Sequence, residues 1–203
     1  MKVLVISAHP SENSYIHSLR KVVLHELEVL RHEVRHRDLY AENFNPVFSA
    51  YERVNHVGNL EQKLQALPDL RSHVEDIQWA DALVLVYPTW WSGQPAILKG
   101  WIDRVLMNEV AWVLPEGASR IKPLLGNIRN VIVVTTHGST KFVNALQGES
   151  GKRTAFRSIR LMFHLRTRCH WIGMYALDHI PHAERGKLIT KVRRRIRRYL
   201  PSA

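Results

Sequence analysis

The chain has 203 residues, of which 45% are hydrophobic and 23% are charged, and its formal net charge is +11. This composition excludes disordered and fibrous classes of protein, and the length is enough for one well-buried core, so we expect a single domain over residues 1–203. The positive charge raises nucleic acid and anionic surfaces as partners, but the sequence carries no recognised nucleic-acid-binding motif, and we expect no nucleic acid partner.

The cysteine and histidine content bears on the cell compartment and on metals. A single cysteine, Cys169, cannot form a disulfide within the chain, and the twelve histidines lack the spacing of a structural zinc motif. The first apolar run is too short for the core of a signal peptide, and no run approaches the roughly 18 apolar residues of a membrane span. These features predict a cytoplasmic protein with no metal centre.

Apolar runs and helical patterns alternate along the chain. The run at 2–8 is typical of a strand buried on both faces, and a helical pattern follows at 13–33, with Asn13 or Ser14 as its N-cap. The other predicted elements are, in chain order, a strand near a sheet edge at 33–40, an irregular segment at 41–68, a helix at 70–80, a strand at 81–88, a helix at 94–107 with Pro95 in its first position, a strand at 130–139, a helix at 152–165, a strand at 168–177 and a basic closing helix at 185–198.

The closing helix has an apolar stripe at helical spacing and a strongly basic opposite face. We expect the stripe to dock on the rest of the protein while the basic face stays in water. The alternative is that the basic face makes a peripheral contact with a membrane or an acidic protein. The stripe consists of Leu188, Ile189, Val192, Ile196, Tyr199 and Leu200.

Five strands that alternate with helices predict an α/β fold, in which a parallel sheet carries helices on both faces. Right-handed crossovers make such a sheet doubly wound, most simply with the flavodoxin-like strand order 2-1-3-4-5. Ligands of these sheets bind beyond the carboxyl ends of the strands, at the point where the strand order reverses. That rule selects three loops, at 9–15, 88–93 and 135–139.

The first loop, "HPSENSY", leads into a helix N-terminus, whose free N–H groups and positive dipole favour a phosphate. Ser11, Asn13 and Ser14 offer further donors, and His9 could pair with the phosphate. A plain helix cap explains Asn13 or Ser14 equally well. The glycine-rich dinucleotide motif and the Walker lysine motif are both absent from the sequence.

The second loop, "PTWWSG", places Trp90 and Trp91 next to a turn at Gly93. Wide apolar area on such a turn suits a planar heteroaromatic ring, with tryptophans as walls and loop N–H groups on the polar edge of the ring. The alternative is that the two indoles simply cover the end of the sheet.

The third loop, "TTHGS", is dense in hydrogen-bond donors, and Gly138 would allow close backbone approach. If the ring is a flavin, these donors would stabilise the negative charge that reduction places on it. His137 is the candidate catalytic residue of the loop, although a lone loop histidine is more often a solvated side chain.

Three segments together resemble the flavodoxin-like NAD(P)H:quinone oxidoreductase family, which includes the quinone reductases and the ancillary oxidoreductases of bacterial potassium-efflux systems. They are "SAHPSENSY" at 7–15, "PTWWSGQPAILKGWIDRV" at 88–105, and "TTHGS" followed by "LQG" at 146–148. The resemblance implies a bound flavin, FMN or alternatively FAD, that takes a hydride from NADH or NADPH. It also implies ping-pong transfer of two electrons to a quinone or similar acceptor, and a homodimer whose partner subunit completes the pocket.

The resemblance implies that His9, Ser14 and Tyr15 hold the phosphate and ribityl chain, that Pro88, Thr89, Trp90 and Trp91 hold the ring, and that Thr135, Thr136, His137 and Gly138 face its polar edge. Two departures stand out. His137 replaces the first of two glycines common in the family, and Asn144 and Ser150 occupy the positions of a tyrosine and a histidine that assist hydride transfer in the eukaryotic quinone reductases.

Two functions remain open from the sequence. The leading one is a flavin-dependent NAD(P)H oxidoreductase acting on quinones. The alternative is a flavodoxin-fold regulatory subunit that docks to a membrane transporter or another acidic partner through the basic helix.

Overall fold

The computed structural model describes residues 1–202, except for the side chain of His182. At its centre lies a sheet of five parallel strands in the order β2-β1-β3-β6-β7. This confirms the predicted order and the edge position of the second strand. The strands are β1 (Lys2–Ser7), β2 (Glu33–Asp38), β3 (Ala82–Pro88), β6 (Asn130–Thr136) and β7 (Arg168–Met174).

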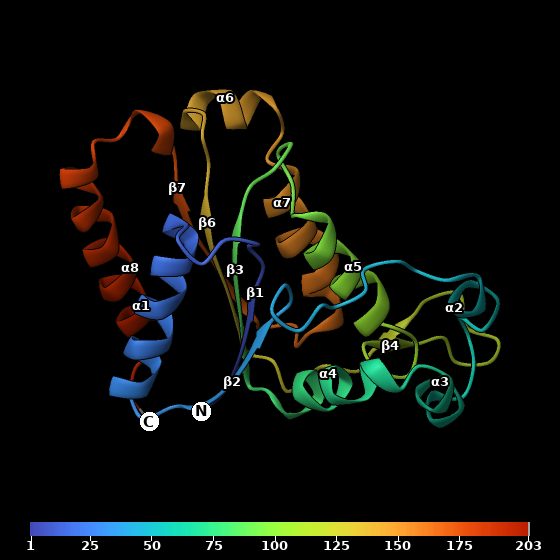
Figure 1. The fold of residues 1–203 in the computed structure, drawn as a ribbon. Coiled ribbons are helices and arrows are strands. Elements are labelled where there is room, and N and C mark those ends of the chain that lie inside the picture. The colour runs from blue at the N-terminus through green and yellow to red at the C-terminus, as the bar shows by residue number, and fades with distance from the viewer. Residues whose placement is uncertain (203) are drawn as a thin grey trace.

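Helices cover both faces of the sheet (Figure 1). On one face lie α1 (Tyr15–Val29) and α8 (Arg185–Tyr199); on the other lie α4 (Pro68–Trp79), α5 (Ala96–Val105) and α7 (Ser150–Arg153). Alternate residues of a strand point to opposite faces, so Val3 and Val5 join the core under α1 and α8, whereas Leu4 and Ile6 join the core under α4 and α5. Every residue of β3 is buried, as expected for a strand covered on both sides.

The ends of two helices refine the sequence expectations. The side chain of Ser14 accepts a hydrogen bond from the N–H of His17, so Ser14, not Asn13, is the N-cap of α1. Pro95 is the N-cap of α5 and Ala96 is its first residue, one position later than predicted. An extended backbone at Pro95 (φ −54°, ψ 147°) explains the difference, because that ψ lies outside the helical region.

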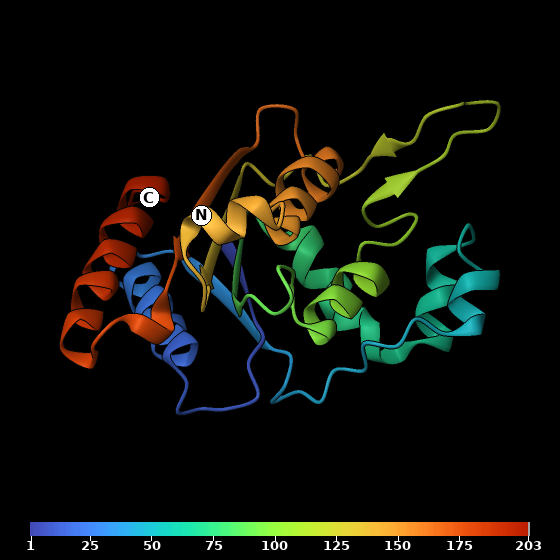
Figure 2. The same ribbon diagram turned by 90° about the horizontal axis from the view of Figure 1, so that it is seen from above.

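Other segments were predicted wrongly. Residues 41–68 contain α2 (Ala50–Val54) and α3 (Leu60–Ala66), and the predicted helix at 152–165 is divided into α7, a π-helical turn η1 (Thr154–Ser158) and a 3-10 turn η2 (Ile159–Met162). Helix α6 (Lys141–Leu146), the 3-10 turns η3 (Leu177–His179) and η4 (His182–Glu184), and a short hairpin of β4 (Trp112–Val113) and β5 (Lys122–Pro123) were not predicted. Figure 2 shows this hairpin, α2 and α3 on the side away from α1 and α8.

The basic closing helix is docked, as predicted. Val192, Ile196 and Leu200 are fully buried against the core under α1, and Leu188, Ile189 and Tyr199 pack at its margin. The buried carboxylate of Glu26 on α1 accepts a 2.6 Å hydrogen bond from Nε of Arg197 and lies 3.5 Å from Nε of Arg193. Two half-exposed arginines of the basic face are thus paired with a buried carboxylate. Within residues 1–202, no helix is long and apolar enough to cross a membrane.

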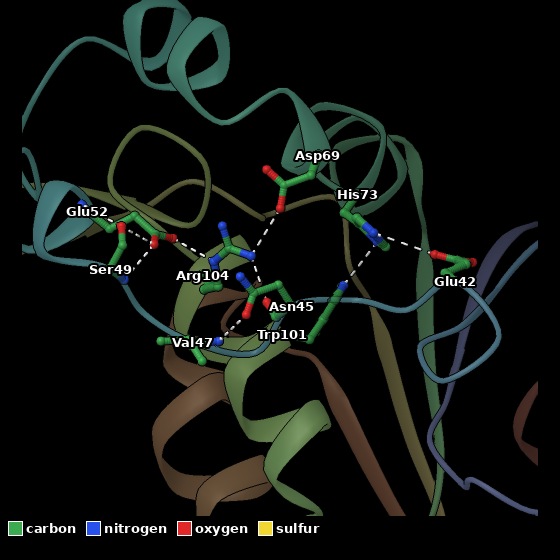
Figure 3. Close-up of polar contacts among 9 residues, drawn as sticks. All are labelled: Glu42, Asn45, Val47, Ser49, Glu52, Asp69, His73, Trp101 and Arg104. Carbon is green, nitrogen blue, oxygen red and sulfur yellow. Dashed lines mark hydrogen bonds and ion pairs between the residues drawn. The ribbon is translucent and has the colours of Figure 1, made fainter.

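A buried arginine fastens the 41–69 region to α5 (Figure 3). Nε of Arg104 donates to Glu52 at 2.7 Å, and its Nη1 donates to the carbonyl of Asn45 at 2.6 Å and to Asp69 at 3.0 Å. The chain crosses α5 very closely here, since a Cβ on Gly100 would lie 2.3 Å from the carbonyl oxygen of Pro46. Only glycine leaves room for that crossing.

His73 lies beside this cluster and is held neutral. Trp101 donates to its Nδ1 at 3.3 Å, so the ring proton is on Nε2, which lies 3.5 Å from a carboxylate oxygen of Glu42 (Figure 3). Burial lowers the pKa of His73 to about 4, and Arg37 and Arg104 act in the same direction.

We expect the fold to lose stability between pH 6.5 and 4 because of His73. An unfolded histidine has a pKa near 6.5, so in this window the unfolded chain binds a proton that the folded state refuses, and the free energy of unfolding falls with pH. His73→Asn keeps an acceptor for Trp101 and should remove about 1 kcal/mol of the loss between pH 7 and pH 5, measured by urea unfolding. His25→Asn, at an exposed position, is the control; an equal effect of both variants would contradict the assignment.

Candidate functional site

Three loops meet where β1, β3 and β6 end, at the end of the molecule that also carries α6 (Figure 1). Hydrogen bonds continue past the strand ends: the N–H of Ala8 donates to Val86 at 3.0 Å, and the N–H of Thr89 donates to the carbonyl of Thr136 at 2.8 Å. The hydroxyls of Thr89 and Thr135 lie 2.9 Å apart. The second and third loops are therefore joined by backbone and side chain, as the rule for open parallel sheets predicts.

In the first loop, the side chain of Ser14 caps α1, the ring of His9 lies beside Trp90, and the hydroxyl of Tyr15 is engaged elsewhere. The N–H of Ser11 donates to Nδ1 of His9 at 2.9 Å, and the His9 ring lies 6.2 Å from the ring of Trp90. The hydroxyl of Tyr15 donates to the carbonyl of Arg185 at 3.0 Å, which ties this loop to the start of α8.

The second loop presents its two indoles to solvent. Trp91 is fully exposed and Trp90 is 41% exposed. Trp90 and Gly93 exchange backbone hydrogen bonds of 3.1 and 3.0 Å, and Trp91 and Ser92 adopt the left-handed conformation with φ of 47° and 61°. Such a backbone is uncommon for a bulky residue and costs energy. The exposure of Trp91 contradicts the alternative that it covers the end of the sheet.

His137 in the third loop is buried, so the interpretation as a solvated loop histidine is wrong. The side-chain N–H groups of Asn144 donate to Ser139 and to the carbonyl of Thr140. This leaves Oδ1 of Asn144 to accept from Nδ1 of His137 at 2.7 Å, and the ring proton is thus on Nδ1. Nε2 of His137 is buried and has no partner among the described residues. Burial lowers the pKa of His137, which the hydrogen bond to Asn144 partly offsets.

A polar cavity of about 220 Å³ lies between the second and third loops. Four predicted site residues line it, and Ser92, Ser139, Asn144 and Gln147 complete its wall. The four are Thr89, Trp91, His137 and Gly138. A Cβ on Gly138 would lie 2.4 Å from a carboxylate oxygen of Asp178, so a larger residue here would displace that exposed side chain. Pro88, Thr135 and Thr136 are buried behind the cavity in the last pairs of β3 and β6.

Tyr175 and Glu149, which hold the ring of His137 in place, were not predicted from the sequence. The ring of His137 stacks on Tyr175 with centroids 4.4 Å apart, and the hydroxyl of Tyr175 donates to Glu149 at 3.0 Å. Burial raises the pKa of Tyr175 to about 12, so the phenol stays neutral. The signal that could have found Tyr175 is its place just after the fifth strand, at the same edge of the sheet as the three loops.

The model of a family described as having a flavodoxin-like fold matches residues 1–200. The chain belongs to this flavodoxin-like family. In doubly wound sheets of this strand order, ligands bind beyond the carboxyl ends of the strands, which is the edge where the cavity between the loops after β3 and β6 lies.

Two curated relatives and two solved structures place the chain within the flavodoxin-like proteins. An uncharacterized NAD(P)H oxidoreductase of Haemophilus influenzae is 37% identical over 123 residues, which are 59% of this chain and 57% of the relative. NAD(P)H dehydrogenase (quinone) 1 of Rattus norvegicus is 28% identical over 162 residues, 74% of this chain and 58% of the relative. The chain thus spans a little over half the length of these relatives.

Among solved structures, Smu.1420 from Streptococcus mutans is 28% identical, with a TM-score of 0.84 and coverage of 98% of this chain and 100% of that one. An FMN-dependent NADH-azoreductase from Bacillus anthracis, solved in complex with FMN, has a TM-score of 0.77 over 97% of this chain and 98% of that one. At 16% identity, this second likeness supports the flavodoxin-like fold alone.

Asn144→Asp tests the orientation of His137. A carboxylate at hydrogen-bonding distance favours the charged imidazole, so we expect the pKa of His137 to rise by about one to three units, followed by NMR titration of the histidine ring. Gln147→Glu places a carboxylate on the same cavity without a bond to His137 and should shift its pKa by less than half as much. Equal shifts in the two variants would contradict the Asn144–His137 pairing.

Proposed function

We propose that the chain is a flavin-dependent NAD(P)H oxidoreductase that passes two electrons to a quinone or a similar small acceptor. The observation that carries the proposal is the joint placement of two exposed indoles, a polar cavity and the unpartnered Nε2 of His137 at one end of the sheet. Apolar walls beside a small set of directed polar groups suit a planar heteroaromatic ring. The names of the two curated relatives support the same reaction class.

The residues present fit an FMN. Its phosphate would meet the N-terminus of α1, where Ser14 is the cap and His9 lies beside the loop. Trp90 and Trp91 would lie along the ring, and the polar edge would meet Nε2 of His137, because the backbone N–H of His137 already donates to Met174 at 2.7 Å. When bound, the flavin supplies the two-electron chemistry, with hydride from NAD(P)H and then to the quinone in ping-pong order.

The protein's own part is to orient the ring and to manage one proton. Reduction of a quinone by NAD(P)H consumes a hydride and a proton and gives the hydroquinone and NAD(P)⁺. With its proton on Nδ1 held by Asn144, His137 has a lone pair on Nε2 that can take up and release that proton. The lowered pKa of His137 keeps this lone pair free at neutral pH.

The site is proposed to be completed by a second copy of the chain. The side chains of Phe142 and Leu146 on α6 are 72% and 73% exposed. They lie next to the cavity that Asn144 lines from the same helix. Exposed apolar side chains that rim a polar site indicate an interface. Sedimentation of the purified protein would give the mass of a homodimer; a monomer at all concentrations would rule this out.

The regulatory alternative has less support. Arg193 and Arg197 of the basic helix are committed to Glu26, and the apolar stripe is buried, so only part of the basic face remains for a membrane or an acidic partner.

The proposed function is tested by colour. The purified protein should show flavin absorbance, or acquire it with FMN, and should bleach when NADPH or NADH is added without oxygen; a quinone should then restore the colour. Chromatography of the released cofactor separates FMN from FAD. A colourless protein that neither flavin can reconstitute would refute the proposal.

A further inference from the structure

A second cavity, of about 370 Å³ and with a basic lining, is linked through consecutive residues of the chain to the polar cavity between the second and third loops, called the ring cavity below. Gln147 lines the ring cavity, and the next residue, Gly148, lines the basic one. Glu149 also lines the basic cavity and accepts the hydrogen bond from Tyr175, on which His137 stacks. An elongated ligand with one end in the ring cavity can therefore reach the basic cavity with its other end.

The charges of this cavity are not balanced. Lys152, Arg153 and Arg157 line it against the single carboxylate of Glu149. Lys152 is paired with that carboxylate at 2.9 Å. Burial raises the pKa of Glu149, but the hydrogen bonds from Lys152 and Tyr175 outweigh it and lower the pKa, so the carboxylate is charged. Among the described residues, Arg153 and Arg157 have no ion pair and no side-chain hydrogen bond.

Arg153 and Arg157 lie close enough in the chain for both to bind the same phosphate group. They are four residues apart on α7 and η1, a spacing that puts side chains on the same face of a helix. The guanidinium of Arg153 lies flat over the turn at Gly148, since its Cζ, Nη1 and Nη2 are all 3.6 Å from where a Cβ would be. Two free guanidinium groups form the forked donors that bind a phosphate through paired hydrogen bonds.

The cavity also offers an apolar wall. Phe156 lines it from between the two arginines and packs edge-on against Trp171, with centroids 6.0 Å apart. A phosphate next to a flat apolar group matches the adenosine 2′-phosphate end of NADPH, which NADH lacks.

We infer that the cavity lined by Arg153, Arg157 and Phe156 binds the 2′-phosphate of NADPH and makes the chain selective for NADPH over NADH. This inference rests on the proposed function for the identity of the donor. It assigns to the basic cavity a doubly charged phosphomonoester on the ribose of adenosine, as distinct from the pyrophosphate that both dinucleotides share.

Calorimetric titration with adenosine 2′,5′-bisphosphate tests the inference without flavin turnover. We expect Arg153→Gln with Arg157→Gln to weaken binding at least about tenfold, the usual scale for losing charge-assisted hydrogen bonds. Arg120→Gln with Arg166→Gln removes the same charge from exposed positions elsewhere and should change binding by less than about twofold. Unchanged binding in the first double variant, or equal loss in both, would overturn the inference.

Two other ligands and one further variant test whether the cavity recognises the 2′-phosphate of adenosine and whether it needs the forked guanidinium group. ADP carries a pyrophosphate and no 2′-phosphate, and inorganic phosphate carries no adenosine; both should bind at least about tenfold more weakly than the bisphosphate. Binding of ADP as tight as that of the bisphosphate would overturn the assignment to the 2′-phosphate. Arg153→Lys keeps the charge and loses the fork, and should give an intermediate affinity.

Anaerobic reduction separates this inference from the proposed function. The flavin-loaded double variant Arg153→Gln, Arg157→Gln should need about tenfold more NADPH than the unaltered protein for half-maximal reduction of the flavin. The NADH concentration that gives half-maximal reduction should not change. If NADH and NADPH reduce the unaltered protein with the same half-maximal concentration, the inferred selectivity for NADPH is wrong, but the reductase function is still supported. If neither nucleotide reduces the bound flavin, the proposed function fails, and the calorimetric comparison still decides whether the cavity binds the 2′-phosphate.

Discussion

Replacing Arg104 with methionine is expected to lower the free energy of unfolding by about 3–5 kcal/mol. Arg104 and Glu52 are 3% and 6% exposed, and Nε of the arginine lies 2.7 Å from the carboxylate. Hydrogen bonds from Ser49 and Arg104 outweigh burial and lower the pKa of Glu52, so the carboxylate is charged in the folded state. Methionine fills much of the space but leaves this charge buried without its cation, and the carbonyl of Asn45 also loses its donor.

Urea unfolding at neutral pH measures the loss, and two further variants interpret it. Arg71→Met breaks the ion pair with Glu61, whose partners are 41% and 59% exposed, and should cost at most about 1 kcal/mol. Arg104→Met combined with Glu52→Gln removes both charges and should recover part of the stability. If Arg104→Met costs no more than Arg71→Met, the buried pair does not fasten the 41–69 region.

Trp90→Ala combined with Trp91→Ala should weaken flavin binding about a hundredfold, because each indole contributes roughly 1–2 kcal/mol of stacking and buried area to a planar ring. The fold should lose much less. Trp91 is fully exposed in the protein without ligand, so its truncation removes almost no packing, and surface changes of this kind usually stay within about 0.5 kcal/mol.

Fluorescence titration of the flavin-free protein with FMN gives the affinity, and urea unfolding of the same protein gives its stability. Tyr51→Ala, at a residue that is also 41% exposed but lies on α2 away from the site, is the matched control. A loss of stability as large as the loss of flavin binding would mean that the indoles pack on the sheet and not on a ring.

The sheet was predictable because its strands are encoded locally. The apolar run ending at Pro88 is buried along its whole length, and the polar loops after the first, third and fourth predicted strands meet at one edge, as the topology requires. The segments that failed depend on distant contacts. Short α2 has only the capping box of Ser49 and Glu52 in the local sequence, and it is fixed to the body through Glu52 and Arg104, which are far apart in the chain.

The same distinction applies to the site. Composition of the third loop drew attention to His137, but its burial depends on Tyr175, which arrives from the end of another strand. Likewise, the sequence marked Asn144 only as a departure from the family pattern. Its hydrogen bond with Nδ1 of His137 depends on the position of α6 over the third loop. Helix α6 was missed because Phe142, Val143 and Leu146 remain exposed, so they do not form the buried stripe that marks a surface helix.

Because Trp91 is fully exposed, its fluorescence can report whether a ligand occupies the second loop. Of the six tryptophans of the chain, Trp101 is buried in the core, where emission lies at short wavelengths, whereas the indole of Trp91 is surrounded by water and emits further to the red. A ring that settled on Trp91 would remove that water and quench its emission by energy transfer. The difference spectrum against Trp91→Phe would then isolate one indole, and occupancy of the loop could be followed in time without any attached dye.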